Sequence, residues 1–401
     1  MRTTGETEMK KKYLFFIYSF LLIIVFTLIF GNAGCSQRER IIKIGSQSVL
    51  SGEFKYYGQE QLVSMNIAAK ELAPVSIGGF NYKISIVSKD DEGNPEKAYL
   101  VSQEMIQEDV AGVIGSTFNA TTKAALPNYQ ELNIPMISTS ASSTDLNRSG
   151  SNFFRLIINN DQIVENAASF ILSRYKPEKL VIISDSSEYS VNFVGFLEKT
   201  LLGISSQKVN IFKKYSIKPE TEDYKLLAEN LLIDDCDLVF FCGGYQVLAK
   251  IITSSRDIGV TSSFLTEKLG MDEGIYQLAD AKYLEGLMAV VPEPPSLAMF
   301  SEDPKAVEFW RKFKDMAPQI KGVEIKEPGK FAPYAYDAFY MIIEAMKKAN
   351  STSPEDYIDV LRSLSFDGIT GHIEFDSSGN LKNPQSTVFQ IKNGTWVRFQ
   401  K

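Results

Sequence analysis

The sequence alternates short runs rich in β-branched and aromatic residues with longer segments whose apolar residues recur at helical spacing. Such an alternation predicts parallel strands covered by helices, because two parallel strands are normally connected by a helix. The pattern runs twice along the chain. Strands are expected at 41–49, 83–90, 110–115 and 135–139, and then at 179–184, 209–215, 237–241 and 263–266. The chain is therefore predicted to form two successive doubly wound α/β units.

The last third of the chain does not begin a third unit of this kind. Its expected elements are a strand at 283–291, helices at 304–316, 334–348 and 354–364, and strands at 371–376 and 387–392. The simplest interpretation is that this part returns to complete both earlier units. Two units also suit the length, since a chain of 401 residues is too long for a single hydrophobic core.

The first 35 residues have the composition of a leader. Lys10-Lys11-Lys12 precede an apolar run at 13–30, and Ala33-Gly34 stand directly before Cys35. This order predicts a secretory signal peptide at 1–35. Its end resembles the signal of bacterial lipoproteins, which implies that Cys35 is lipidated and tethers the exported chain to a membrane. An uncleaved transmembrane anchor is the alternative, since about 18 apolar residues could just span a bilayer.

Charge and composition argue against several classes of function. The chain has a net charge of −7 and no basic stripe, so nucleic acid is not an expected partner. His372 is the only histidine and no phosphate-binding loop occurs, so neither an enzyme nor a metal site is expected. Cys236 and Cys242 flank a predicted strand and would lie roughly 20 Å apart when extended. They are interpreted as buried apolar side chains, not as a disulfide.

A series of short motifs recurs in an order and spacing typical of one protein family. The motifs are Ile44-Gly45, Tyr57-Gly58, Asp90-Asp91, Asn94-Pro95, Val113-Ile114-Gly115, Ile134-Pro135, Gly243-Gly244-Tyr245, Glu285-Gly286-Leu287, Tyr334-Ala335-Tyr336-Asp337-Ala338 and Phe366-Asp367-Gly368. Together they resemble the type I periplasmic binding proteins of ABC importers, in the branch that binds leucine, isoleucine and valine. The resemblance extends from Ile41 to Val397.

This resemblance implies two doubly wound, parallel-sheet lobes joined by a three-crossover hinge, with the ligand held between them. The first lobe would comprise 41–155 and 288–368, and the second 156–287 and 369–401. No cofactor is implied. The protein would act as a monomer that delivers a small solute to an ABC permease.

Two loops of the first lobe are candidates for ligand contact, because ligands of doubly wound sheets lie at the carboxyl ends of strands. The first follows the strand at 110–115 and ends at Asn119, which we expect to cap the next helix. The backbone N–H groups and dipole of that helix would suit a carboxylate. The second loop spans 138–144. Family positions for ligand contact fall here on Asn119, Ser140, Ala141 and Ser142.

The second lobe is expected to supply the contacts made on closure. Tyr189 and Tyr245 each follow a predicted strand, and Tyr57 of the first lobe is placed near the mouth of the site; packing alone is the alternative for all three. The family's amino-acid binders place an acid after the strand at 263–266, to pair with the ligand's ammonium. Glu267 is the candidate, but Lys268 competes for that position and would repel an ammonium.

The sequence thus predicts an exported, lipid-anchored solute-binding protein of an ABC importer, whose ligand is a small polar carboxylate, foremost a branched-chain amino acid. Ligand-driven closure is expected about crossovers near Leu156, Val291 and Ile369. Two alternatives stay open. One is a ligand-sensing receptor subunit with the same fold, and the other is a binder of an amide, urea-like or organic-acid solute.

Overall fold

A computed structural model describes residues 40–148, 152–204, 210–218, 221, 223–292, 304–382, 384 and 386–399, together with Phe15 and Tyr18. The leader, apart from those two residues, and the lipidation candidate Cys35 lie outside the described residues. Among the described residues, no helix is both long and apolar enough to cross a membrane. The chain from Ile42 onward forms one compact unit.

The first sheet has six strands in the order β2-β3-β1-β4-β5-β6. Their bounds are β1 Arg40–Ser48, β2 Val75–Ile77, β3 Phe80–Asp90, β4 Gly112–Gly115, β5 Met136–Ser138 and β6 Phe153–Arg155. The pairs β1–β4, β4–β5 and β5–β6 are parallel, whereas β2 pairs antiparallel with β3. The predicted parallel sheet is therefore confirmed, with a short antiparallel strand added at one edge.

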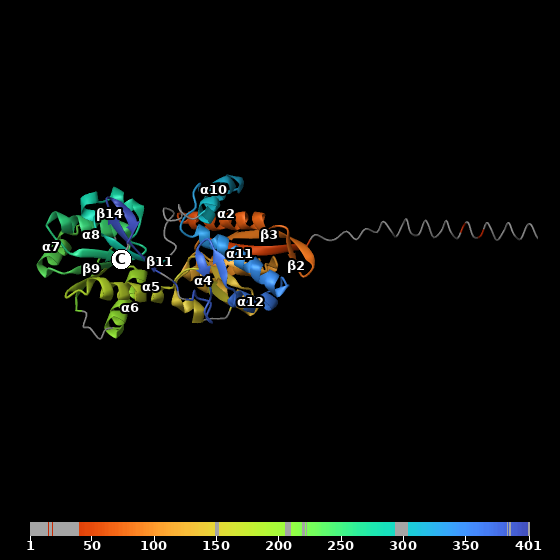
Figure 1. Ribbon diagram of the computed structural model, residues 1–401, viewed down its shortest axis with the longest axis horizontal. Coiled ribbons are helices and arrows are strands. Elements are labelled where there is room, and N and C mark those ends of the chain that lie inside the picture. Colours follow the sequence, from red (N-terminus) through yellow and green to blue (C-terminus); the bar gives the residue numbers. More distant parts are fainter. Residues whose placement is uncertain are drawn as a thin grey trace, which may run out of the picture. The chain divides into compact units, whose positions relative to one another are not determined.

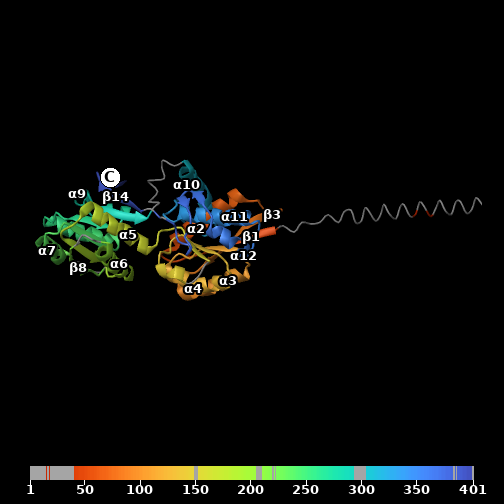
Figure 2. The ribbon, with the colours of Figure 1, turned by 60° about the horizontal axis from the view of Figure 1, so that its bottom comes forward.

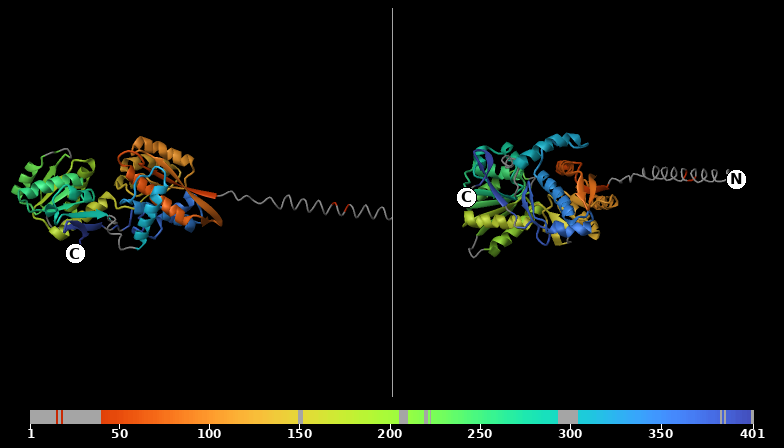
Figure 3. Two further views of the ribbon diagram at one scale, coloured as in Figure 1. Left: turned by 90° about the horizontal axis from the view of Figure 1, so that it is seen from above. Right: turned by 45° about the vertical axis from the view of Figure 1, so that its right-hand side comes forward.

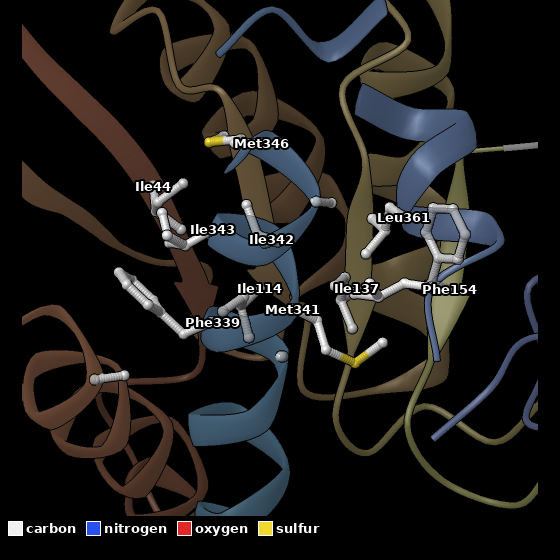
Figure 4. Packing of buried hydrophobic residues seen from close by; sticks show 14 of the residues in the cluster. Ile44, Ile114, Ile137, Phe154, Phe339, Met341, Ile342, Ile343, Met346 and Leu361 are labelled. Carbon is white, nitrogen blue, oxygen red and sulfur yellow. The ribbon is translucent and has the colours of Figure 1, made fainter. Parts of the chain in front are cut away.

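Helices cover both faces of this sheet. On one face lie α2 (Lys55–Leu72), α11 (Ala332–Ala349) and α12 (Pro354–Arg362), and on the other α3 (Pro95–Gln107) and α4 (Asn119–Glu131) (Figure 2). Figure 4 shows the first of these cores, where Phe339, Ile342 and Ile343 of α11 meet Ile44 of β1 and Ile114 of β4. The last third of the chain thus supplies the helix that buries the central strands. Helix α10 (Pro304–Met316) packs beside α2 through Phe309 and Phe313.

The second sheet has seven strands in the order β15-β14-β11-β10-β9-β7-β8. Their bounds are β7 Leu180–Ser184, β8 Ile211–Ser216, β9 Leu238–Cys242, β10 Ser263–Thr266, β11 Met288–Pro292, β14 Ser386–Lys392 and β15 Thr395–Arg398. The pairs from β8 to β11 are parallel, and the C-terminal hairpin β14–β15 adds antiparallel strands at the other edge. Both views in Figure 3 place the blue C-terminal strands beside the green elements of this sheet.

Helices also cover both faces of the second sheet, as Figure 1 shows. One face carries α5 (Asn160–Phe170) and α6 (Glu188–Ile204), and the other α7 (Lys225–Asp234), α8 (Tyr245–Asp257) and the single turn α9 (Ala281–Leu284). Cys236 and Cys242 are buried and unpaired, as predicted. Two doubly wound sheets are therefore present.

Two segments near the predicted lobe boundaries lie in the other lobe. Strand β11 was assigned to the first lobe from residue 288 onward, but it hydrogen-bonds to β10 and β14 of the second sheet. The hairpin β12 (Phe366–Gly368) and β13 (Gly371–Ile373) is followed by Phe375, which packs into the first core although 369–401 was assigned to the second lobe. The cause is the buried carboxylate of Asp337 on α11, which accepts from the backbone N–H of Ile369 at 3.0 Å and of Thr370 at 2.8 Å. Elsewhere the boundaries remain a prediction.

Candidate ligand-binding site

The loop between β4 and α4 forms one side of the candidate site. Helix α4 begins at Asn119, so its N-cap is Phe118, and the prediction that Asn119 caps the helix is wrong by one residue. The backbone of Phe118 is still extended, and its side chain offers no acceptor to the first turn. Thr121 Oγ1 instead accepts from the backbone N–H of Phe118 at 3.2 Å. The N–H groups of the first helical turn therefore have no side-chain cap from Phe118.

The loop after β5 is tied to the loop after β4 by two hydrogen bonds. Asn119 Oδ1 accepts from the backbone N–H of Ser143 at 3.0 Å, and Ser140 Oγ donates to the carbonyl of Thr117 at 2.7 Å. Within the second loop, Ser138 Oγ accepts from the backbone N–H of Ala141 at 2.9 Å. The structure thus brings Asn119, Ser140, Ala141 and Ser142 together at the carboxyl ends of β4 and β5, as the sequence predicted.

Arg155 holds the loop after β5 in place, and the sequence did not reveal this role. The side chain is 0 % exposed, and its Nη1 and Nη2 atoms donate to the carbonyls of Ala141 at 3.2 Å and Ser143 at 2.9 Å. Burial lowers the pKa of the guanidinium to about 10, so Arg155 stays charged at neutral pH. A charged residue directly after Phe153-Phe154 at a strand end was the available signal, because Arg is almost never fully buried without partners.

Glu267 is enclosed within the second lobe. It follows β10, is 0 % exposed, and its Oε2 accepts from the Tyr189 hydroxyl at 3.0 Å and from the backbone N–H of Leu269 at 3.1 Å. The Cys242 thiol lies 3.7 Å from Oε1. Burial raises the pKa of Glu267, and burial followed by the Glu267 charge raises the pKa of Tyr189. The two predicted site residues Tyr189 and Glu267 are therefore hydrogen-bonded to each other inside the second lobe.

Lys268, the neighbour of Glu267, is the residue that reaches the first lobe. Its Nζ donates to Ser142 Oγ at 3.3 Å and lies 5.2 Å from the centroid of the Tyr189 ring. Burial, with a further contribution from the positive charge of Lys330, lowers the pKa of Lys268 to about 8 despite the opposing effect of Glu267. Of the two residues that competed for this position, Lys268 thus faces the Ser140–Ser143 loop.

Tyr57 belongs to an aromatic cluster of the first lobe. Its ring lies 5.6 Å from the ring of Phe331, and Lys330 Nζ lies 5.9 Å from the Tyr57 centroid. Burial is the main cause of its raised pKa, to which the negative charge of Asp272 from the second lobe adds. Tyr57 therefore lies where charges from both lobes act.

Tyr245 is held against its own lobe. It is the first residue of α8, and its ring packs against the second core. The ring lies directly over Gly274, where an added Cβ atom would come within 2.7 Å of it. Among the contacts of the described residues, none joins the Tyr245 side chain to the first lobe. Ligand contact by Tyr57, Asn119, Ser140, Ala141, Ser142, Tyr189, Tyr245 and Glu267 stays a prediction.

Comparison with known proteins identifies relatives along nearly the whole chain. Residues 41–395 match the family described as periplasmic binding protein. The leucine-, isoleucine-, valine-, threonine- and alanine-binding protein of Pseudomonas aeruginosa is 26 % identical over 365 residues, which cover 90 % of this chain and 92 % of the relative.

Solved structures share the fold. The branched-chain amino acid transporter substrate-binding protein of Streptococcus pneumoniae, in complex with isoleucine, aligns with a TM-score of 0.69 and 21 % identity over 90 % of this chain and all of that chain. A solute-binding protein from R. palustris in complex with benzoate aligns with a TM-score of 0.66 and 18 % identity, covering 89 % of this chain and 95 % of that one.

Proposed function

Because the chain belongs to the periplasmic binding protein family, whose members are solute-binding proteins, we propose that it is the receptor of an ABC importer and holds a small carboxylate between its lobes. The observation that carries the proposal is the hydrogen bond from Lys268 to Ser142. It joins the strand-end loop of the second sheet to the tied loops of the first. Strand ends of doubly wound sheets are the usual ligand positions.

The chemistry of the first-lobe edge suits a carboxylate. The first turn of α4 presents backbone N–H groups without a side-chain cap, and a helix N-terminus attracts negative charge. Ser140 and Ser142 add hydroxyl groups on the neighbouring loop, and Lys268 supplies a positive charge. A ligand carboxylate placed between these groups would gain charge-assisted hydrogen bonds from both lobes.

Two ligand classes fit this description. The relative from P. aeruginosa is named for amino acids, which favours a branched-chain amino acid here. The R. palustris protein was solved with benzoate, a carboxylate without an ammonium group. The position of Lys268 favours the second class, an organic acid, as the alternative.

Binding would close the two lobes. A carboxylate that contacts the α4 loop and Lys268 at once is held by both lobes only in the closed form, so it shifts the population toward that form. The hinge would lie at the crossovers near Leu156, Val291 and Ile369. A permease could then distinguish the loaded receptor from the empty one.

Export and anchoring complete the proposal. The leader at 1–35 would direct the chain out of the cytoplasm, and a lipid on Cys35 would keep the monomeric receptor beside its permease in the membrane. Incorporation of a labelled fatty acid into the wild-type protein, and its loss in Cys35→Ser, would test the anchor. A sensing role would require a partner other than the permease.

Thermal unfolding against a panel of amino acids and organic acids tests the ligand proposal. A ligand at about 100 times its Kd should stabilise the folded protein by roughly 2.7 kcal/mol and raise its Tm. Isothermal titration then gives the affinity of each hit. A Tm that stays constant with every carboxylate of the panel would reject the proposed function.

A further inference from the structure

Three acidic side chains that follow strands, Asp91, Asp185 and Glu267, form their hydrogen bonds within their own lobes. Asp91 follows β3 and accepts from the backbone N–H of Gly93 at 3.0 Å and from the Ser116 hydroxyl. Asp185 follows β7 and accepts from the backbone N–H of Gly244 at 3.0 Å. Asp91, Asp185 and Glu267 are all buried. None of the three presents an open oxygen to a solute held between the lobes.

The basic groups at the same edges are placed differently. Lys268 of the second lobe reaches Ser142, and Lys330 of the first lobe lies over aromatic rings, with its Nζ 5.2 Å from the centroid of Phe331 and 5.9 Å from that of Tyr57. Within the part of the chain that the structure describes, no carboxylate oxygen lies within 4.0 Å of either ammonium. The two lysines are close enough for Lys330 to disfavour the charged form of Lys268. Two ammonium groups without a carboxylate at ion-pair distance therefore act on this region from the two lobes, and the Asp272 charge that acts on Tyr57 offsets them only from farther away.

Glu60, an acid close enough for Lys330 to lower its pKa, is disfavoured as a carboxylate. Glu60 on α2 is 1 % exposed, and burial raises its pKa to about 8 although Lys330 and nearby backbone N–H groups oppose the shift. The nearby N–H groups affect its pKa, but among the described residues none forms a hydrogen bond of good geometry with either carboxyl oxygen. A mostly protonated Glu60 leaves the Lys330 charge for a ligand.

An α-amino acid places its ammonium one carbon from its carboxylate. If the carboxylate sits at the α4 loop and Ser142, that ammonium lies near Lys268, where like charges repel. A buried ammonium without an acceptor is also costly, and Glu267 is already enclosed by Tyr189 and Leu269. Removing the ammonium removes both penalties while the carboxylate keeps its partners.

We infer that this receptor selects small organic acids that lack an α-ammonium group, with Lys268 as counter-ion of the ligand carboxylate and as the residue that excludes zwitterionic amino acids. Lys330, on the opposite lobe, likewise attracts the ligand carboxylate and repels an ammonium group. The inference rests on the proposed function, since it names the ligand class of the same site.

A matched pair of ligands isolates the decisive group. Leucine and 4-methyl-2-oxopentanoate share the carbon skeleton and the carboxylate and differ at the ammonium-bearing position, while 4-methylpentanoate and benzoate extend the acid series. Titration calorimetry of the full-length wild-type protein in detergent is expected to give an affinity for at least one acid of this series about tenfold or more above that for leucine.

Variants assign the selectivity to residues. Lys268→Gln should weaken binding of the acid by about tenfold or more and bring its affinity close to that of leucine, and Lys268→Glu should reverse the preference. Lys330→Gln, an exposed surface change, should weaken the acid less but in the same direction. Lys282→Gln on α9, where the lysine pairs with Asp280, is the control and should leave both affinities unchanged.

The outcomes separate the two proposals. Tight binding of leucine by the wild-type protein, or an acid preference that survives in both Lys268→Gln and Lys330→Gln, overturns this inference and leaves the proposed function intact. Absence of binding by every amino acid and every organic acid overturns both. If Lys268→Gln fails to fold, the Lys330→Gln titration and the wild-type ligand pair still decide.

Discussion

The Tyr189 hydroxyl donates to Glu267 Oε2 at 3.0 Å, and this hydrogen bond keeps the acid of the β10 edge inside the second lobe. The same tyrosine ring lies beneath the Lys268 ammonium. One side chain thus determines which charge the second lobe presents: the carboxylate is turned inward and the ammonium outward.

Replacement of Tyr189 by Phe tests this arrangement. The change leaves a buried carboxyl oxygen with one partner fewer, so the free energy of unfolding should fall by about 1–3 kcal/mol in urea titrations. Tyr283→Phe is the control, because the exposed Tyr283 hydroxyl contacts Asp257 at the surface, and it should change stability by no more than about 0.5 kcal/mol. Equal losses in the two variants would contradict a special role for Tyr189.

Glu60 should make stability depend on pH. Its folded pKa of about 8 lies above the reference value of 4.5, so the folded protein holds more protons than the unfolded chain between those values. This contribution is fully present below about pH 4.5 and is lost as the pH rises toward 8. Urea unfolding of Glu60→Gln should therefore show a smaller loss of stability than the wild-type protein between pH 5 and 8, by on the order of 1–3 kcal/mol.

The exposed Glu131 provides the control for that experiment. Glu131→Gln removes a carboxyl group at the end of α4 without removing a buried one, and its pH profile should follow that of the wild type. A Glu60→Gln profile parallel to both would show that the buried carboxyl does not change protonation on unfolding.

Asn119 and Ser142 are expected to matter for binding more than for folding. Asn119→Ala removes the acceptor for the Ser143 N–H and Ser142→Ala removes the acceptor for Lys268, so each should weaken the best ligand of the panel by roughly 3- to 30-fold. Titration calorimetry measures the loss, and circular dichroism checks the fold. Unchanged affinity in both variants would reject the placement of the site.

Asn128 on α4 is a matched control for Asn119. Its amide donates to Ser102 Oγ at 2.7 Å and to the Tyr99 carbonyl at 3.2 Å, which joins α4 to α3 away from the strand ends. Asn128→Ala should lower the Tm while ligand affinity stays at the wild-type value.

Ligand affinity should fall with rising pH if Lys268 is the counter-ion. Its pKa of about 8 in the free protein means that the ammonium is lost as the pH passes through that value, and an anion binds the protonated form. The Kd of an organic acid should thus increase between pH 7 and 9.5, by at most about tenfold per pH unit above the pKa. Calorimetry across this range with Lys268→Gln should give a flatter profile; a wild-type profile that is equally flat would argue against this role.

The sequence allowed much of the architecture to be predicted, because strand and helix periodicity are local signals. Asn119 and the 138–144 loop were both placed after strands by that pattern. Two details of the prediction were wrong, one because it depends on a distant strand and one by a single residue. The sequence of β11 suits either sheet, and only its pairing with β14 decides between them. Helix α4 starts one residue before the predicted position because Phe118 is still extended.

The choice between Glu267 and Lys268 could not be made from the sequence. Adjacent residues after a strand point to opposite sides, so a shift of one position exchanges an acid for a base at the site. The deciding contacts come from Tyr189, 78 residues away in the chain, and from Ser142, 126 residues away. Arg155 escaped prediction for the same reason, since its carbonyl partners are set by the loop conformation.

The late strands and helices of the chain have a consequence for how the protein is made. Strands β14 and β15 close the edge of the second sheet, and α11 covers the centre of the first. During synthesis, the central strands of the first sheet cannot be covered on this face until α11 has been translated, and the second sheet lacks its last edge strands until the chain is nearly complete. Contacts between distant segments also slow folding. A nascent chain with this topology therefore stays incompletely folded until its last third is made, which is the state that export by the proposed leader at 1–35 would require.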